Sequence, residues 1–448
     1  MEIIYHRCAG LDVHKKTVVA CRMRTGEHGQ VEWETKTFGT KTVELLALLD
    51  WLSEWELSHV ALESTGDYWK PIYNLQEGNF EVVLVNAKHV HHVPGRKTDV
   101  NDSEWLAELM RYGLLKGSFI PPQTQRDLRD LTRYRTRLVR ERSRLVNRVQ
   151  KLLEGANIKL ASVVSDIMGK SGRAMLEALV AGETDAAVMA ELAKGRLRTK
   201  LSELEKALTG LVRPHHRFLL AQQLSHIDFL DEQIEALSQA IERHMAESET
   251  AGPAGSPSSE TVDPTTGEVQ EQAPTPETKP PVSFSQAVAL LDTIPGVNHR
   301  LAEIIVAELG TDMSRFPTAK HAAAWAGVAP GNNESAGKRY SGKTREGNQA
   351  LQDALSEAAW AASRTKESYL AALYHRLAGR RGKKRAIVAL AHSILVSSYY
   401  MLARHEPYRD LGRNYFDERK KETVINRLLH RLEKLGFSVT IEPAAVPA

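Results

Sequence analysis

The chain has 448 residues, of which 42% are hydrophobic, so it is long enough to bury a sizeable core in two or three domains. Its formal net charge is only +3, which excludes a uniformly positive protein that attracts polyanions from every side. A polyanionic partner would therefore have to meet local basic patches.

The cysteines and the apolar segments narrow the class of protein further. Cys8 and Cys21 form no CxxC pair, which argues against a thiolate zinc site and a disulfide scaffold. Residues 1–7 lack the features of a signal peptide. The longest apolar stretch, residues 386–401, is broken by His392 and several serines, which favours a buried helix over a membrane span. We expect a cytoplasmic protein with no membrane partner.

The first 124 residues have the pattern of an α/β domain. Short apolar runs predict strands, and leucines at helical spacing predict helices. The predicted strands are 8–13, 17–23, 31–38, 59–63 and 81–85, and the predicted helices are 43–53 and 68–75. Because strands alternate with helices, we expect a central sheet covered by helices.

Four acidic residues stand where these elements begin or end. Asp12 and Glu63 interrupt or end apolar strands, where an unpaired carboxylate is costly to desolvate. Asp99 and Asp102 precede an apolar periodic run, so a helix beginning near them would carry both acids at its positive end. Two alternatives remain: Asp99 caps a helix, and the strand acids reach solvent or pair with Lys or Arg.

If the four acids meet at one edge of the sheet, they repel one another unless cations lie among them. Carboxylate oxygens suit hard divalent cations, and two Mg²⁺ ions about 3.5–4 Å apart are the usual means of activating a hydroxyl and stabilising the leaving oxygen of a phosphodiester. Arg96 and Lys97 then lie in position to contact the backbone phosphates. We interpret His89, His91 and His92 as part of a polar loop rather than as ligands.

Three stretches carry a resemblance to a known family. They are GLDVHKK around Asp12, ALESTGDYWKP around Glu63, and NAKHVHHVPGRKTDVNDSEWLAEL around Asp99 and Asp102. Together they resemble the N-terminal domain of the insertion sequence 110 family of transposases, which are site-specific DNA recombinases with a RuvC-like, RNase H-type fold. The resemblance implies that these four acids form a catalytic, metal-binding D-E-D-D tetrad.

A long basic helix follows this domain. Residues 126–151 contain ten Lys or Arg and three acids, too lopsided a charge for ordinary pairing within one helix. We therefore interpret five arginines as contacts to a nucleic-acid backbone, with a solvated helix face as the alternative. They are Arg133, Arg137, Arg140, Arg144 and Arg148.

Two series of apolar residues recur every seven positions. The first is Leu131, Leu138, Leu145 and Leu152, and the second is Leu220, Ile227, Ile234 and Ile241. This spacing predicts coiled-coil arms that are either antiparallel within the chain or formed between subunits.

The segment 246–282 is expected to be a disordered linker, because its seven prolines, many Ser and Thr and excess of acids cannot build a core. We therefore expect five parts. They are the α/β domain 1–124, the arms 125–245 with a helical insertion at 155–212, the linker 246–282, an all-α domain 283–408, and a helix and tail 409–448.

The second domain opens with a segment that resembles a helix-hairpin-helix. In that motif a Pro-Gly turn, here at Gly296, presents backbone N–H groups to a phosphate. The alternative is an ordinary helix–turn–helix packing unit.

A polar loop farther along also matches the family, which carries a serine after an aromatic–Ala–Gly–apolar–x–Pro segment. The aligned residue is Ser335, and the resemblance implies that it is the nucleophile that joins covalently to DNA; Ser341 is the rival. A lone serine is a poor nucleophile, so its activation would have to come from the metal site across a domain or subunit boundary. Further cations suited to phosphate contacts are Lys338, Arg339, Lys343, Arg345, Arg380, Arg381, Lys383, Lys384 and Arg385.

The residue patterns alone support a metal-dependent phosphodiester site with basic helical arms. The family resemblance implies, beyond that, a Mg²⁺-dependent DNA recombinase of an insertion element. The resemblance also implies donor and target DNA, a structured non-coding guide RNA, homo-oligomers (dimers or tetramers), and a nucleoid-associated location in a bacterial or archaeal cell. The alternative is a RuvC-like endonuclease, such as a Holliday-junction resolvase, that hydrolyses DNA without covalent serine chemistry. A third class, a non-catalytic nucleic-acid scaffold, is the least consistent with the four acids.

Overall fold

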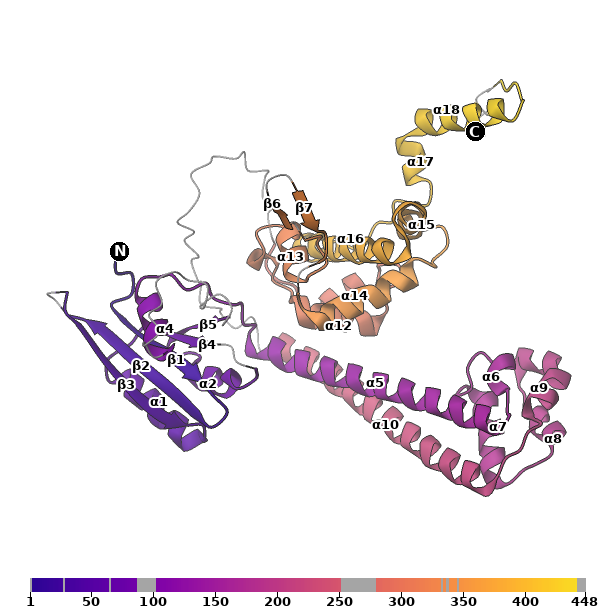
Figure 1. The fold of residues 1–448 in the computed structure, drawn as a ribbon, viewed down its shortest axis with the longest axis horizontal. Helices are drawn as coiled ribbons and strands as arrows, with labels where there is room; N and C mark the ends of the chain where they lie inside the picture. The colour runs from indigo at the N-terminus through magenta and orange to yellow at the C-terminus, as the bar shows by residue number, and fades with distance from the viewer. Residues whose placement is uncertain are drawn as a thin grey trace. The chain divides into compact units, whose positions relative to one another are not determined.

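The structure is a computed structural model that describes residues 2–26, 29–63, 66–86, 102–250, 279–331, 333–335, 338–344 and 346–440. Residues 251–278 of the predicted linker lie outside these residues. The prediction that the linker begins at 246 is wrong, because residues 246–250 are the last turn of a helix, α10 (Pro214–Thr250). The chain divides into two compact units, Met1–Pro121 and Pro122–Ala448, which are described in turn (Figure 1). The finer boundaries inside the second unit stay predictions.

The first unit is built on a mixed five-stranded sheet. Its order is β3-β2-β1-β4-β5, with β2 antiparallel to both β1 and β3, and with β4 parallel to both β1 and β5. The strands are β1 Arg7–Val13, β2 Thr17–Thr25, β3 Val31–Gly39, β4 His59–Glu63 and β5 Glu81–Val85. The five predicted strands are confirmed to within two residues at each end, and the sheet is consistent with the RuvC-like domain that the sequence resembles.

Each face of the sheet buries a separate apolar cluster. Leu11 and Leu62 pack on the face covered by helices α1 (Thr42–Ser53) and α2 (Trp69–Gln76). The opposite face packs against helix α4 (Asp102–Arg111), which contributes, among others, Leu106, Leu109 and Met110. α1 and α4 therefore lie on opposite sides of the sheet (Figure 1). Both predicted helices of this unit are confirmed.

Helix α4 lies so close to β1 that no side chain fits between them at Gly10. A Cβ added to Gly10 would lie 2.3 Å from the carbonyl oxygen of Ser103 and 2.4 Å from the backbone nitrogen of Ala107. Both atoms belong to the backbone of α4, which cannot move aside cheaply. Glycine at this position therefore fixes the first turn of α4 against the sheet.

The second unit begins with two long helices, α5 (Gln123–Gly155) and α10 (Pro214–Thr250), which lie side by side (Figure 1). They are antiparallel, because Thr124 contacts His244 whereas Arg142, farther along α5, contacts Asp231 near the middle of α10. The short helices between them are α6 Leu160–Val163, α7 Lys170–Ala181, α8 Ala186–Glu191 and α9 Leu201–Leu208.

The heptad residues of both helices lie in this intramolecular contact. Leu138, Leu145, Leu220 and Ile227 are buried in one cluster, and Ile241 is buried in another. The two seams therefore pack within one chain, as one of the two sequence alternatives expected. Supercoiling of the pair stays a prediction.

The remaining helices form one core around α16 (Lys383–Arg404). They are α11 Phe284–Leu291, α12 His299–Leu309, α13 Ala319–Trp325, α14 Gln349–Ala362 and α15 Tyr369–Arg381. Helix α16 is long and apolar enough to cross a membrane by length and composition, but 61% of its most apolar window is buried inside the protein. The interruption by His392 and serines thus correctly indicated a core helix.

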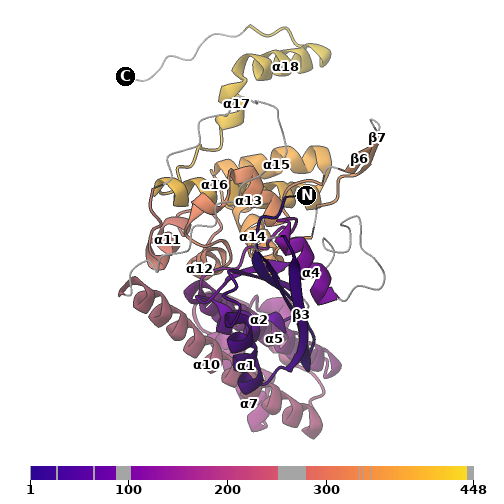
Figure 2. The same ribbon diagram turned by 90° about the vertical axis from the view of Figure 1, so that its left-hand side faces the viewer.

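Two smaller elements complete the second unit. A hairpin of β6 (Asn333–Ser335) and β7 (Lys338–Ser341) follows α13. The prediction of an all-α domain at 283–408 is therefore wrong here, because these short polar strands lack the apolar alternation that indicates a strand. The last two helices are α17 (Tyr415–Arg419) and α18 (Lys421–Lys434), and neither buries a residue. Phe416 of α17 stacks on Tyr369 of α15, and α18 extends beyond α17 (Figure 2).

We predict that Gly10→Ala lowers the free energy of unfolding by about 1–3 kcal/mol, because the added methyl group overpacks the contact with α4. Urea titration of the purified chain measures this change. Gly26→Ala is the matched control, since its nearest neighbour would be 3.8 Å from the new Cβ. Equal stability of the two variants would contradict the prediction.

Candidate functional site

Asp12 and Glu63 come from the same end of two neighbouring strands. The register pairs Leu11 of β1 with Leu62 of β4, so the two acids are the next residues of parallel strands roughly 4.8 Å apart. Because side chains alternate along a strand and Leu11 and Leu62 face α1, the two acids face the side covered by α4. The sheet thus brings together two of the four predicted acids.

Asp102 approaches the same place from α4. It precedes Ser103, whose backbone touches Gly10, and Gly10 lies two residues before Asp12 on the same face of β1. The electrostatics agree with this position. Burial raises the pKa of the Asp12 carboxyl, nearby His14 lowers this pKa, and the Asp102 carboxylate raises it again.

His14 is a member of this site that the sequence interpretation missed. Its Nε2 lies 3.1 Å from Oδ2 of Asp12, whose side chain is only 13% exposed. The signal was available, because residues 12 and 14 share one face of an extended chain. When protonated, His14 provides the positive charge that an ionised Asp12 needs in the absence of another cation.

The oxygen donors here suit a hard divalent cation, which carboxylates bind better than thiolate or imidazole sites do. The repulsion between Asp12 and Asp102 also favours a cation between them. Within the described residues no group of three or more His, Cys, Asp or Glu side chains is placed closely enough to hold a metal ion. The fourth predicted acid, Asp99, lies outside the described residues, as do Arg96, Lys97 and the three histidines between 89 and 92.

The predicted serine lies on the β6–β7 hairpin. Ser335 pairs with Lys338 beside the turn, whereas the rival Ser341 pairs with Asn333. The structure does not describe the side chains of Ser335, Ser341 and Arg339, nor any part of Arg345. The side chains of Lys338 and Lys343 are exposed. The hairpin therefore places one predicted cation directly opposite Ser335 in backbone register.

Two glycines close the loop that carries this hairpin. A Cβ on Gly331 would lie 2.1 Å from the carbonyl oxygen of Lys343, and one on Gly347 would lie 2.6 Å from the backbone of Ala326. Both approaches are possible only without a side chain. The base of the loop is therefore held against the end of α13.

The turn at Gly296 has a packing role. Its φ is +90°, and a Cβ there would lie 2.4 Å from the backbone nitrogen of Ala362 in α14. The N–H of Leu301, in the first turn of α12, is bonded to the side chain of Asn298. These contacts explain the glycine by the close packing of the turn against α14, which fits the alternative of an ordinary helix–turn–helix packing unit. A phosphate contact at this turn stays a prediction.

The arginines of α5 have acidic partners that the sequence argument overlooked. Arg129 and Arg133 bind Glu308 of α12, and Arg135 binds Glu303 of the same helix. Arg140 binds Asp353 of α14. The lopsided charge of α5 is thus partly neutralised by other helices, so it is not by itself evidence for a polyanion at Arg133 or Arg140.

Other predicted cations lie at the surface. Arg137, Arg144 and Arg148 are exposed, and the described part of the chain records no acidic partner for them. The same holds for the basic cluster 380–385 between α15 and α16. Because the latter cations lie at the positive end of α16, they repel one another and the helix dipole, and a bound anion would relieve this repulsion.

Comparison with protein families identifies the class of protein. Residues 9–158, which include the acidic site and α5, match a family described as transposase, the D-E-D-D transposases of the IS110 type. Residues 288–375, which include the hairpin, match the family described as transposase IS116/IS110/IS902 family. No curated protein is similar enough to the chain to count as a match.

The two matches, in this order along one polypeptide, define the chain as a transposase. It belongs to the insertion sequence 110 family with the D-E-D-D motif, as the sequence motifs indicated. It is therefore an enzyme that cleaves and recombines DNA for an insertion element, and its family uses a divalent metal ion.

We predict that Glu308→Gln lowers the free energy of unfolding by about 3–5 kcal/mol, because the buried Arg129 loses the charge that compensates it. Burial already lowers the pKa of Arg129 to about 10. Urea titration measures the change. Asp231→Asn, which removes the partner of the more exposed Arg142, should cost no more than about 1 kcal/mol. A loss as small for Glu308→Gln would contradict this prediction.

Proposed function

We propose that this transposase cleaves and rejoins DNA through a Mg²⁺-dependent acidic site and a serine nucleophile, Ser335. The position of Asp12, Glu63 and Asp102 at one end of the sheet is the observation that most supports it. Donor and target DNA are the substrates. The family resemblance supports a structured non-coding RNA as the guide and a homo-oligomer as the active form.

In this proposal Asp12, Glu63, Asp99 and Asp102 hold two Mg²⁺ ions. When bound, the ions supply positive charge to the phosphodiester oxygens and favour deprotonation of the attacking hydroxyl. The contribution of the chain is to fix the acids on rigid strands and on α4. His14, whose Nε2 lies 3.1 Å from Oδ2 of Asp12, orients this carboxyl group before the site is filled.

Ser335 forms the covalent link in this scheme. Its Oγ loses a proton and bonds to phosphorus while the bond from phosphorus to the leaving strand's oxygen breaks, and that oxygen takes up a proton. The hydroxyl of another strand reverses the exchange, so DNA is rejoined and the serine is released. Ser335 must therefore meet an acidic site of the same subunit or of another one.

The exposed cations position the nucleic acid. Lys338 beside Ser335, Lys343 in the same loop, and the cluster 380–385 can each neutralise backbone phosphates. Their contacts carry no sequence information, so the choice of target falls to the guide RNA.

Replacing one acid should abolish strand cleavage without unfolding the protein. We predict that Asp12→Asn or Glu63→Gln lowers Mg²⁺-dependent cleavage of donor DNA at least about 100-fold, as expected when charge stabilisation of the transition state is lost. Gel analysis of cleaved strands measures it, with chelation of the metal as a second arm. Glu81→Gln, an exposed acid at the start of β5, is the control that should cleave normally. Full cleavage by Asp12→Asn would contradict the proposed role of this metal site.

Replacing Ser335 separates the recombinase from the alternative nuclease. We predict that Ser335→Ala forms no covalent protein–DNA adduct on a nicked donor, whereas Ser341→Ala still does. Denaturing gels with labelled DNA detect the adduct. Continued cleavage by Ser335→Ala with free DNA ends would instead identify a RuvC-like endonuclease that uses water. An adduct that persists in Ser335→Ala would exclude this serine as the nucleophile.

A further inference from the structure

A cationic groove lies inside the second unit, between α5, α12 and α14. It has a volume of about 720 Å³. Three cations of α5, Arg133, Arg137 and Arg140, and Arg300 of α12 line it. The sequence interpretation named the first three as backbone contacts but had no groove in which to place them.

Two acids that line the groove form ion pairs with two of its arginines. Asp353 and Glu357 lie one turn apart on α14, and they bind Arg140 and Arg300 respectively, the latter at 2.9 Å. Within the described residues Arg137 has no recorded acidic partner, although it lies between Arg133 and Arg140 on the wall of the groove. Of the four arginines in the groove, Arg137 is uncommitted, Arg133 is bound to the buried Glu308, and the other two are held by the acids of α14.

The rest of the lining suits a nucleotide. Trp325, which packs on Phe316, adds an aromatic ring to the lining. The amide nitrogens of Asn348 and Gln349 donate to Glu308 and Asp353, and each has a second N–H that can serve as a donor to a ligand. Gly347 and Asn348 also end the loop that carries Ser335, so the groove lies at the base of that loop.

We propose that this groove binds the phosphodiester backbone of a single-stranded segment beside the serine loop. In the absence of the strand, the carboxylates of Asp353 and Glu357 bind the arginines that would otherwise contact its phosphates. The inference rests on the proposed function, since it names the strand that Ser335 would act near. A phosphate offers an arginine the same paired oxygens as a carboxylate does, so each ion pair can be exchanged for a phosphate contact.

The size of the groove favours a single strand. Its volume falls within the range of small-molecule sites, so a duplex cannot enter it, whereas an unstacked base and its phosphate can. Exposed ion pairs such as Arg140–Asp353 contribute little to stability, so an incoming polyanion can open them.

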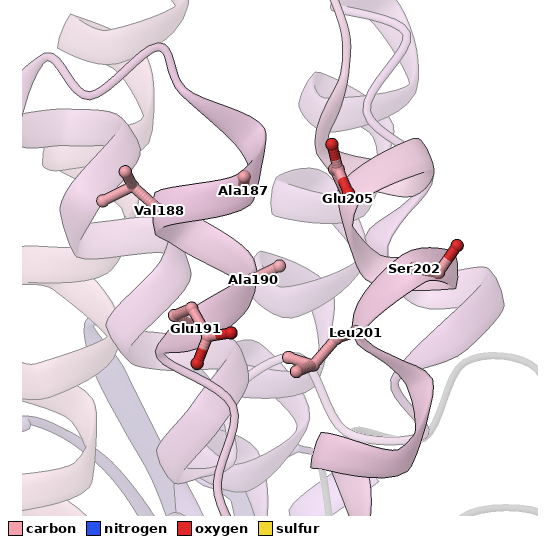
Figure 3. Close-up of a pocket in the computed structure, with 7 residues that line it drawn as sticks. All are labelled: Ala187, Val188, Ala190, Glu191, Leu201, Ser202 and Glu205. Atoms are coloured by element: carbon pink, nitrogen blue, oxygen red, sulfur yellow. The ribbon is translucent and has the colours of Figure 1, made fainter.

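A second hollow shows the contrast. It has a volume of about 360 Å³ and lies between α8 and α9 (Figure 3). Its described lining consists of apolar residues such as Val188 and Leu201, a serine and two acids, Glu191 and Glu205. Without a cation in that lining, it offers nothing to a phosphate.

The test measures binding rather than cleavage, so that its failure is distinct from failure of the recombinase proposal. The full chain carrying Asp12→Asn is titrated with labelled single-stranded DNA, single-stranded RNA and duplex DNA of one sequence, by fluorescence anisotropy at several salt concentrations. Asp353→Asn and Glu357→Gln should each tighten single-strand binding about two- to fivefold, the strength of an exposed ion pair.

Arg137→Ala should weaken single-strand binding and reduce the slope of log affinity against log salt by about 0.7, the value for one phosphate contact on a single strand. Arg137→Lys should restore most of the slope. Preference for the DNA or for the RNA strand identifies the source of the segment, and either preference supports the groove.

The matched control is Asp231→Asn, which removes one acid and releases Arg142 on α5 outside the groove lining. Equal tightening by Asp231→Asn and Asp353→Asn would mean a general charge effect and would overturn the proposal. An unchanged salt slope in Arg137→Ala would overturn it as well, as would effects confined to duplex DNA.

Discussion

The close contact of α4 with Gly10 is the constraint on which the acidic site depends. A helix normally stands off a sheet by the length of the side chains between them, but here its backbone touches that of β1. The contact fixes the first turn of α4 beside the end of β1. Asp102 is thereby held close enough to change the pKa of Asp12. An acid from a helix and acids from two strands are brought together because one position lacks a Cβ.

In the second unit, buried carboxylates organise the basic helix. Glu308 is fully buried and forms ion pairs with Arg129 and Arg133 of α5. Glu303 pairs with Arg135, and the side chains of these two residues are almost fully buried. Such pairs are costly to form unless every partner is in place, so they specify how α5 sits on α12. They also divide the arginines of one helix into those that build the fold and those that remain at the surface.

This division changes how the nucleic-acid surface is understood. Among the described residues, the predicted phosphate contacts that are exposed without a recorded acidic partner are Arg137, Arg144 and Arg148 on α5, together with cations near the hairpin and between α15 and α16. Arg140 and Arg300 belong to an intermediate class, because exposed acids on α14 hold them in a groove. Gly347 and Asn348 end the loop that carries Ser335 and also line that groove, so the strand that we propose to bind there would lie beside the proposed nucleophile.

The sequence by itself predicted the five strands of the first unit, its helices and the family, but not the β6–β7 hairpin. Alternating and helical apolar patterns are local, so they located the elements of the first unit. They also placed all four acids at element ends, and the structure describes three of these acids. The spacing of Asp12 and His14 was visible in the sequence, but only the structure shows that the two side chains meet at 3.1 Å. The sequence also could not tell which arginines are free, because Arg133 and Glu308 are 175 residues apart and Arg140 and Asp353 are 213 apart. Only the tertiary structure decided those pairings, since an ion pair depends on distance in space, which packing sets and spacing along the chain does not.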